Sequence, residues 1–265
     1  MKKIFLTLIF ILFIFVLTGC HQEITYDDLY LKYKEHIENN SEIYQLDIDY
    51  FNQLSSTTIK SVVLVEKLII AAPGSATGSG VIIKSDANFY YVLTNNHVIF
   101  VQNDVQFTYS ISDYKGNKYT ATLVAQNQDY DLAILKFSRG NLSLNSIELA
   151  PINPDINHRV AVLGYPTYQI NAITIGNTIE YSPIDLEGSI LNVINVMFDV
   201  LISDVPVKSG SSGSVVINDD FQLVGLIYAG NFVDDSESSE YSFAIPVEKV
   251  YEFFQLAGFS LGVQS

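Results

Sequence analysis

Apolar and polar positions divide the chain into a long β-like part and a shorter helical part that precedes it. From Ile59 onward, short runs rich in Val, Ile, Leu, Tyr and Phe alternate with turns that contain Gly, Asn, Asp and Pro, which is typical of β-strands. These runs form two groups on either side of a loop-like stretch at 138–158: residues 61–70, 79–84, 89–95, 104–111, 118–126 and 132–137, then residues 159–166, 172–182, 190–203, 214–219, 222–230 and 241–245. The pattern predicts an all-β domain at 59–265 with two six-stranded antiparallel units, at about 59–138 and 159–245, each a barrel or a sandwich.

Helical periodicity is found near both ends of the chain. Residues 20–58 contain no Gly or Pro, and apolar side chains recur at helical spacing at Leu29, Tyr33 and Ile37 and again at Leu46, Tyr50 and Leu54. We interpret this segment as a helical N-terminal extension of one or two helices, and a mostly solvated spacer remains the alternative. Residues 246–257 begin with Pro, keep their apolar side chains on one face and stop before Gly258, which predicts a C-terminal helix.

The first 19 residues have the features of an export signal. Two lysines precede an apolar run that is shorter than the roughly 20 residues a membrane-spanning helix needs. The four residues from Leu17 to Cys20 resemble the bacterial lipobox, which implies cleavage before Cys20 and a lipid on that cysteine. A plain secretory signal is the alternative. We therefore expect an exported, extracytoplasmic protein held at the cell membrane by its lipid, and, because Cys20 is the sole cysteine, one without a disulfide framework.

The charge of the chain limits its partners. The formal net charge is −15, and removal of residues 1–19 with their two lysines makes it −17. Such an acidic surface repels phosphates, so neither nucleic acid nor anionic lipid headgroups are expected ligands, and the membrane is reached through the lipid instead.

A histidine and an aspartate lie where strand ends aim side chains into a cleft. His97 follows a strongly apolar strand in YYVLTNNHVIF, and Asp131 precedes the buried run of QDYDLAILKF. A histidine can act as a general base when a buried carboxylate holds its tautomer. Asp129 offers the same carboxylate two residues earlier and could be a simple turn former, as could Asp131, but Asp131 adjoins the buried run and is preferred.

The nucleophile candidate lies in VKSGSSGSVV. Gly210 and Gly213 bracket Ser212, so the backbone can turn tightly and present the N–H groups of Gly210 and Ser212 toward one point, as an oxyanion hole requires. On composition alone, a flexible Gly/Ser turn is the favoured alternative.

The order of these motifs resembles that of a known family. TNNHV, DLAILK and GSSGS follow one another as in the trypsin-like, chymotrypsin-fold serine peptidases, and GSGVII before them and FAIP after them are similar to the HtrA/Deg type of protease domain. The resemblance covers about residues 59–257 and implies two six-stranded antiparallel β-barrels. It implies that Ser212 is the nucleophile, His97 the general base, Asp131 its orienting acid, and the N–H groups of Gly210 and Ser212 the oxyanion hole, with no cofactor or metal.

Three features depart from the family pattern. Ser211 replaces the Asp or Asn that usually precedes the nucleophile, so activation by a charge pair with a new N-terminus is not expected. Ser214 replaces a glycine, as in some secreted relatives that cleave after Glu, but the histidine that meets the Glu in those enzymes is missing from the following strand. The chain after Ser212 is too short for the PDZ domains that follow many HtrA protease domains, so none is expected.

The resemblance also indicates a substrate pocket. Its floor would lie near Pro206 and one wall near Leu226, Ile227, Tyr228 and Ala229, which are apolar and favour an aliphatic side chain, although Asp204 could reverse this preference. The expected partners are protein or peptide substrates, and the oligomeric state stays open. A catalytically silent pseudoprotease that binds peptides or misfolded proteins remains the main alternative, beside a lipid-anchored binding protein with a coincidental set of these residues.

Overall fold

The structure is a computed structural model that describes residues 26–70, 75–100, 107–168, 172–184, 196–232 and 236–262. Cys20 and the predicted export signal therefore lie outside the described residues. Within the described ranges, no helix is both long and apolar enough to cross a membrane.

The described residues form two sets of strands with helices at both ends of the chain. The first set comprises β1 (Val62–Ile69), β2 (Ser75–Ser85), β3 (Phe89–Asn95), β4 (Phe107–Ser112), β5 (Lys118–Asn127) and β6 (Leu132–Ser138). The second comprises β7 (Arg159–Gly164), β8 (Ala172–Ser182), β9 (Val200–Ser203), β10 (Val215–Ile217), β11 (Leu223–Gly230) and β12 (Ser242–Pro246). The helices are α2 (Tyr26–Asn39), α3 (Ser41–Ser56), α4 (Asn96–Ile99) and α5 (Val247–Leu256), with short 3-10 turns η1 (Thr58–Ser61) and η2 (Pro166–Tyr168).

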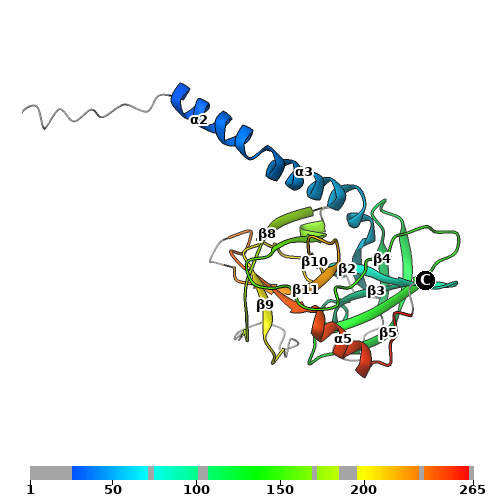
Figure 1. The fold of residues 1–265 in the computed structure, drawn as a ribbon. Coiled ribbons are helices and arrows are strands. Elements are labelled where there is room, and N and C mark those ends of the chain that lie inside the picture. Colours follow the sequence, from blue (N-terminus) through cyan, green and yellow to red (C-terminus); the bar gives the residue numbers. More distant parts are fainter. Residues whose placement is uncertain are drawn as a thin grey trace, which may run out of the picture. The chain divides into compact units, whose positions relative to one another are not determined.

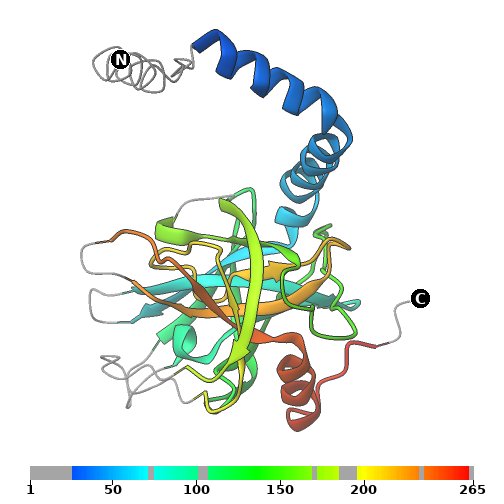
Figure 2. The same ribbon diagram turned by 60° about the vertical axis from the view of Figure 1, so that its left-hand side comes forward.

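Each set of strands closes into an antiparallel barrel (Figures 1 and 2). The first barrel has the order β1–β2–β3–β6–β5–β4 and the second the order β10–β11–β12–β9–β8–β7. Pairing of β1 with β4 closes the first barrel, and pairing of β10 with β7 closes the second. The expected all-β architecture of two six-stranded antiparallel barrels with a C-terminal helix is confirmed, and closure leaves neither sheet with a free edge.

The two barrels share a hydrophobic core. One cluster of buried side chains combines residues of the first barrel, such as Leu93 and Leu132, with residues of the second, such as Leu163 and Leu226, all of them inaccessible to solvent. Separate clusters fill the interior of each barrel. Because burying one such side chain contributes roughly 1.5–3 kcal/mol, this shared cluster holds β3 and β6 against β10 and β11.

The packed unit begins inside α3. The chain divides between Asp49 and Tyr50, and Tyr50 and Leu54 are both buried in the shared core. The Tyr50 ring is tilted by 33° against that of Phe221, with 5.4 Å between the ring centres, and the guanidinium of Arg159 lies 4.2 Å from the centre of the Tyr50 ring. Residues 26–56 are helical, apart from a turn at Asn40, as one of the two interpretations of this segment expected, and the last part of α3 belongs to the barrel unit.

One predicted strand is shorter than its apolar pattern suggested. Of the run at 190–203, residues 196–203 are described, and only Val200–Ser203 form a strand, β9. Its partner β8 ends at Ser182, which pairs with Val200, and the next residue is Pro183, which has no N–H to donate. Met197 is accordingly 83% exposed. The end of the partner strand, and not apolar content, sets where β9 begins.

Candidate active site

Asp131 directly precedes β6, and its side chain is hydrogen-bonded to His97 in the short helix α4. Its carboxylate Oδ2 lies 2.7 Å from Nδ1 of His97, and its Oδ1 accepts a 2.8 Å hydrogen bond from the backbone N–H of the same residue. The first N–H groups of a helix have no partner within the helix, and here Asp131 supplies it from another strand. The same carboxylate therefore fixes both the backbone and the ring of His97.

The backbone of Asp131 has an unusual conformation that makes this double contact possible. Its φ is +48°, in the left-handed region that few residues other than Gly, Asn and Asp adopt. In this conformation its carbonyl accepts hydrogen bonds from the N–H of Asn96 and from Nδ2 of Asn95, both 3.0 Å long. A left-handed residue costs of order 1–3 kcal/mol, and these bonds together with those to His97 stabilise it. The strained residue is therefore the one whose carboxylate contacts His97.

The contact with Asp131 favours one tautomer of His97. Asp131 is fully buried, whereas the His97 side chain is 13% exposed. Because an ionised carboxylate can only accept hydrogen bonds, this contact favours a neutral His97 ring with its proton on Nδ1 and a lone pair on Nε2. Asp129, the alternative acid in the sequence, is exposed at the turn before β6, where its N–H donates to Oδ1 of Asn127.

The turn that contains Ser212 has two left-handed glycines. Gly210 has φ +88° and Gly213 has φ +82°. A Cβ at Gly213 would lie 1.9 Å from the carbonyl oxygen of Ser79, so only glycine fits there. A Cβ at Gly210 would approach the backbone nitrogen of Thr167 to 3.1 Å. The turn is therefore a specific packed conformation, and the flexible Gly/Ser linker considered for this sequence does not describe it.

The four carbonyls of the turn are all engaged in hydrogen bonds. Their donors, in order along residues 209–212, are Thr167 N at 2.9 Å, Ser79 Oγ at 3.4 Å, Ser214 N at 2.8 Å and Ser79 N at 2.6 Å. Because C=O and N–H point in opposite directions across a trans peptide, each of these bonds also sets the direction of the following N–H.

The N–H groups of the same turn alternate between used and unused. The N–H of Ser211 donates to Lys208 O at 3.0 Å, and the N–H of Gly213 donates to Ile227 O at 2.8 Å. Within the described ranges, no hydrogen bond uses the N–H of Gly210 or of Ser212. Both residues are partly exposed, so these two donors are accessible from solvent and could bind an anionic ligand.

Ser212 and the His97 helix pack on the same residue of β2. A Cβ at Gly78 would lie 2.9 Å from Ser212 O and 2.7 Å from Cγ2 of Val98, the residue that follows His97. Ser212 is partly exposed, and no described residue forms a hydrogen bond with its hydroxyl. The fold thus joins His97 and Asp131 directly and places the backbone of Ser212 close to their helix, with its hydroxyl unbonded.

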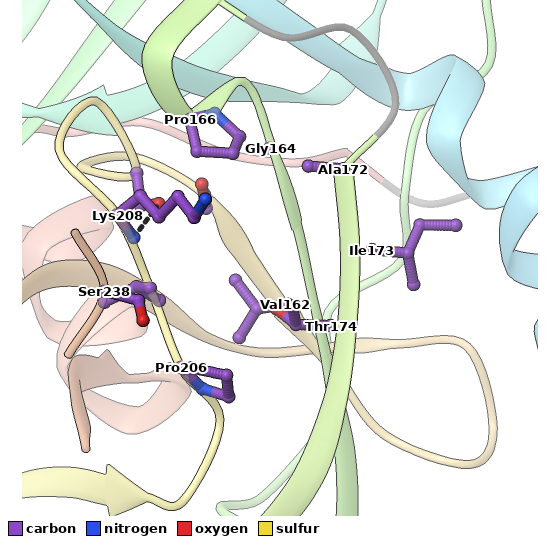
Figure 3. A pocket seen from close by; sticks show the side chains of 12 residues that line it. Val162, Gly164, Pro166, Ala172, Ile173, Thr174, Pro206, Lys208 and Ser238 are labelled. Atoms are coloured by element: carbon purple, nitrogen blue, oxygen red, sulfur yellow. Dashed lines mark hydrogen bonds between the residues drawn. The ribbon is translucent and has the colours of Figure 1, made fainter. Parts of the chain in front are cut away.

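The residues expected to line a substrate pocket do not form one cavity. Leu226, Ile227 and Tyr228 are at most 2% exposed, and Ala229 is half-buried. Pro206 instead lines a cavity of about 250 Å³ between the 206–211 segment and strands β7 and β8, which none of these four residues lines. Figure 3 shows this cavity, with Pro206, Lys208 and Ser238 across from the residues of β8 and a dashed line marking the hydrogen bond from Lys208 N to Ser211 Oγ. The predicted substrate pocket stays a prediction.

The space between the 206–208 segment and the end of β11 is filled. A Cβ at Gly230 would lie 2.8 Å from Cγ2 of Val207 and 3.0 Å from Ser239. The N–H of Ser239 donates to Val207 O, and the N–H of Val207 donates to Oγ of Ser239. Asp204 does not lie in this contact, since its carboxylate accepts a hydrogen bond from Asn177 N on β8. Any side chain bound between these segments meets an apolar and closely packed surface.

Sequence reasoning missed the residues that hold the Ser212 turn. Ser79 stands within the quoted GSGVII motif and Thr167 follows Pro166, but neither was assigned a role. Ser79 contacts the turn from more than 130 positions away in sequence, and only the fold brings it there. Tyr228 is a second missed feature: its hydroxyl has no partner in the described residues, and burial, with a smaller effect of the Asp131 charge, raises its pKa above the ordinary range.

Comparisons with known proteins agree with this fold. Residues 78–226 match the family described as the trypsin-like peptidase domain. An HtrA-like serine protease of Staphylococcus aureus is 26% identical over 74% of this chain, which corresponds to 26% of that protein, so the chain spans about a quarter of the length of the curated relatives it matches. A protease of M. tuberculosis in its active form is 25% identical, with a TM-score of 0.61 over 78% of this chain and 84% of that one. A serine endoprotease of Yersinia pestis is 26% identical, with a TM-score of 0.60 over 78% of this chain and 66% of that one.

Proposed function

The chain belongs to the trypsin-like peptidase domain family, and from this premise we propose that it is an HtrA-type serine endopeptidase that cleaves proteins or peptides. The observation that carries the proposal is the buried Asp131 carboxylate bonded to Nδ1 of His97, beside a turn in which the Gly210 and Ser212 N–H groups have no described partner.

In this proposal the reaction begins with Ser212. Its Oγ attacks the carbonyl carbon of the scissile peptide while its proton passes to Nε2 of His97. Asp131 keeps the Nδ1 proton in place and stabilises the imidazolium that forms. His97 then gives its proton to the leaving amine, which departs and leaves an ester on Ser212. A water molecule, deprotonated by His97, attacks that ester and releases the acid, which returns Ser212 to its starting state.

The oxyanion would bind to the turn. Attack places a negative charge on the former carbonyl oxygen, and the N–H groups of Gly210 and Ser212 are the two donors of the turn that are not already used. Loss of one such donor typically raises the barrier by about 3–4 kcal/mol. Because the carbonyls of the turn are already bonded, these donors need no rearrangement when the charge develops.

The substrate side chain before the cleaved bond is proposed to be small and aliphatic. The close contact of Val207 with Gly230 leaves no deep slot between these segments, and no charged side chain lies in that contact. Peptides with Ala or Val at this position should be cleaved in preference to matched peptides with Phe, Arg or Glu. Preferential cleavage after any of the last three residues would contradict this part of the proposal.

We also propose that the enzyme acts outside the cytoplasm while attached to the membrane by a lipid on Cys20. The support is the lipobox-like sequence at Leu17–Cys20 behind a short apolar run. Labelled palmitate should be incorporated into the wild-type protein in bacterial cells and not into the Cys20→Ala variant. Release of the wild-type protein from membranes by high salt alone would contradict the lipid anchor.

A fluorophosphonate probe tests the central proposal. It should label the wild-type protein, and labelling should disappear in Ser212→Ala, with Ser209→Ala as a control that retains it. Absence of labelling in folded wild-type protein would overturn the proposal. A casein digest separates the pseudoprotease alternative, because a silent binding module would retain unfolded casein without producing fragments.

A further inference from the structure

Ser79, on β2, uses every hydrogen-bonding group it has, and two of its bonds go to carbonyls of the Ser212 turn. Its Oγ accepts from Tyr165 N at 2.9 Å and from Ser214 Oγ at 3.1 Å, and it donates to Gly210 O at 3.4 Å. A serine hydroxyl has one donor and two acceptor positions, so all three are occupied. Ser79 is completely buried, and its bonds connect the first barrel to two separate segments of the second.

The backbone of Ser79 holds the same turn at a second point. Its N–H donates to Ser212 O at 2.6 Å, and its own carbonyl accepts from Oγ1 of Thr94 at 2.7 Å. Thr94 lies near the end of β3, three residues before His97. One residue therefore fixes the carbonyls of Gly210 and Ser212 and is itself fixed by the strand that leads to the base.

The sequence leaves space for this arrangement at two glycines. A Cβ at Gly164 would lie 1.8 Å from Oγ of Ser214 and 2.8 Å from Oγ of Ser79, and a Cβ at Gly213 would lie 1.9 Å from Ser79 O. Ser214 is therefore a partner of Ser79, and it stands where relatives with the GxSGG pattern have glycine. Its hydroxyl donates to Ser79, which leaves the single proton of Ser79 free to reach Gly210 O.

We propose that Ser79 is a positioning residue for the peptidase reaction and that its hydroxyl, oriented by Ser214, keeps the oxyanion turn formed before substrate binds. The mechanism is indirect: Ser79 bonds the Gly210 and Ser212 carbonyls, whose peptide units carry the N–H groups of Ser211 and Gly213, and it thereby fixes the peptide units next to those that carry the two unused N–H groups. The neighbouring Ser211 contributes a neutral bond as well, since its Oγ accepts from Lys208 N at 3.2 Å. Neutral hydroxyls thus hold the turn, and one of them, that of Ser211, stands where many relatives have a carboxylate. In this proposal no freshly cleaved N-terminus is required to form the turn.

The test compares four variants, of which one is a matched control. Ser79→Ala removes the hydroxyl and fits the same space, and Ser214→Ala removes only the donor to Ser79. The double variant should behave like Ser79→Ala, because residues in one hydrogen-bond network have non-additive effects. The control is Ser112→Ala on β4, which also removes a buried serine hydroxyl, but one that has no hydrogen-bond partner in the described residues.

Activity per active site is the first measurement. With the concentration of reactive Ser212 determined by fluorophosphonate titration, Ser79→Ala should lower kcat about tenfold to a hundredfold, since small displacements of a catalytic group have effects of this size. The KM of Ser79→Ala should stay within about twofold of the wild-type value. The adduct of a peptide aldehyde with Ser212 carries the oxyanion, so such an aldehyde should bind more weakly by the same factor by which kcat falls. Ser112→Ala should match the wild type in all three. An unchanged kcat for Ser79→Ala, or a fall in active-site concentration alone, would overturn the proposal.

Amide hydrogen exchange is the second measurement and needs no catalytic activity. In Ser79→Ala the amides of Ser211 and Gly213, which donate to Lys208 O and Ile227 O, should exchange faster, while the amide of Leu226 in β11 keeps its protection. Unchanged exchange in the turn, or equal loss of protection throughout the second barrel, would overturn the positioning role. The inference rests on the proposed function for its chemistry. If the wild-type protein failed to hydrolyse peptides, the proposed function would fail by the first measurement, and the exchange data would still decide whether Ser79 forms the turn.

Discussion

Replacement of Asp131 by Asn tests the proposed mechanism most directly. In the wild-type protein the carboxylate accepts two hydrogen bonds from His97, one from the backbone N–H at 2.8 Å and one from Nδ1 at 2.7 Å. The Asn side chain can accept the first through Oδ1, but it presents an NH₂ group to Nδ1. His97 would then carry its proton on Nε2, where it could not accept the proton of Ser212.

The expected loss follows from this change of tautomer. The backbone bond and the geometry of α4 should persist, so the variant should fold and bind substrate with an unchanged KM. Loss of the correct tautomer in a Ser-His-Asp triad lowers kcat about 10⁴-fold, which corresponds to about 5 kcal/mol in barrier height. Initial rates on a fluorogenic peptide that ends in Ala or Val, measured between pH 6 and 9, provide the assay, with circular dichroism to verify the fold.

Asp129→Asn is the matched control for this experiment. Asp129 is two residues away, has the same chemistry and is exposed, so its replacement should leave kcat within about twofold of the wild type. The reasoning would be refuted if Asp131→Asn retained more than about a tenth of the wild-type kcat, or if the two variants lost activity equally.

Three further predictions concern the turn and the interior. Gly210→Ala should lower kcat about a hundredfold and destabilise the fold by about 1–3 kcal/mol, because φ is +88° and the new Cβ would approach Thr167 N; normal rates and an unchanged urea midpoint would contradict this. Burial alone would raise the pKa of Asp113, but hydrogen bonds from the side chains of Asn117 and Tyr119 and from backbone N–H groups hold it below its ordinary 3.8. A depressed pKa contributes stability that is present above the unfolded pKa and is lost as pH falls through the folded pKa. Asp113→Asn should therefore be less stable than the wild type at pH 7 by urea unfolding, and the difference in free energy should shrink below about pH 4. A difference that grew on acidification would contradict this prediction. Tyr228→Phe should leave the free energy of unfolding equal or raise it by about 1 kcal/mol, since the hydroxyl is buried without a described partner, and a marked loss of stability in thermal unfolding would show that this hydroxyl is bonded.

The sequence was sufficient to predict the contact between His97 and Asp131, which lie in two short motifs. His97 and Asp131 each adjoin a strongly apolar strand, and the pairing of β3 with β6 along their whole length brings the two strand ends together. The preference for Asp131 over Asp129 depended on its position next to the buried run, and the structure places Asp131 in the interior and Asp129 at the surface. Local pattern could predict this contact because both residues belong to neighbouring strands of one barrel.

The remaining features depend on contacts between the barrels. The bonds of Ser79 to Gly210, Ser212 and Ser214 connect β2 with a turn of the other barrel, and no periodicity in either segment indicates that contact. The extent of β9 similarly depends on where Pro183 ends its partner strand. Whether Leu226 to Tyr228 present side chains or only backbone to a ligand could not be predicted either, because their apolar character suits a core and a pocket equally.

The N–H groups of residues 210–213 alternate between hydrogen-bonded and unbonded. Ser211 and Gly213 donate to the protein itself, and Gly210 and Ser212 keep their donors unused. This division depends on fixed partners on either side of the turn, Lys208 O before it and Ile227 O on β11. Insertion of a single residue between Ser209 and Gly210 would lengthen the chain between these partners, and the bond from Thr167 N to Ser209 O would no longer fix the Gly210 N–H. Such an insertion should lower catalysis, and neither barrel would need to unfold for the loss to be observed.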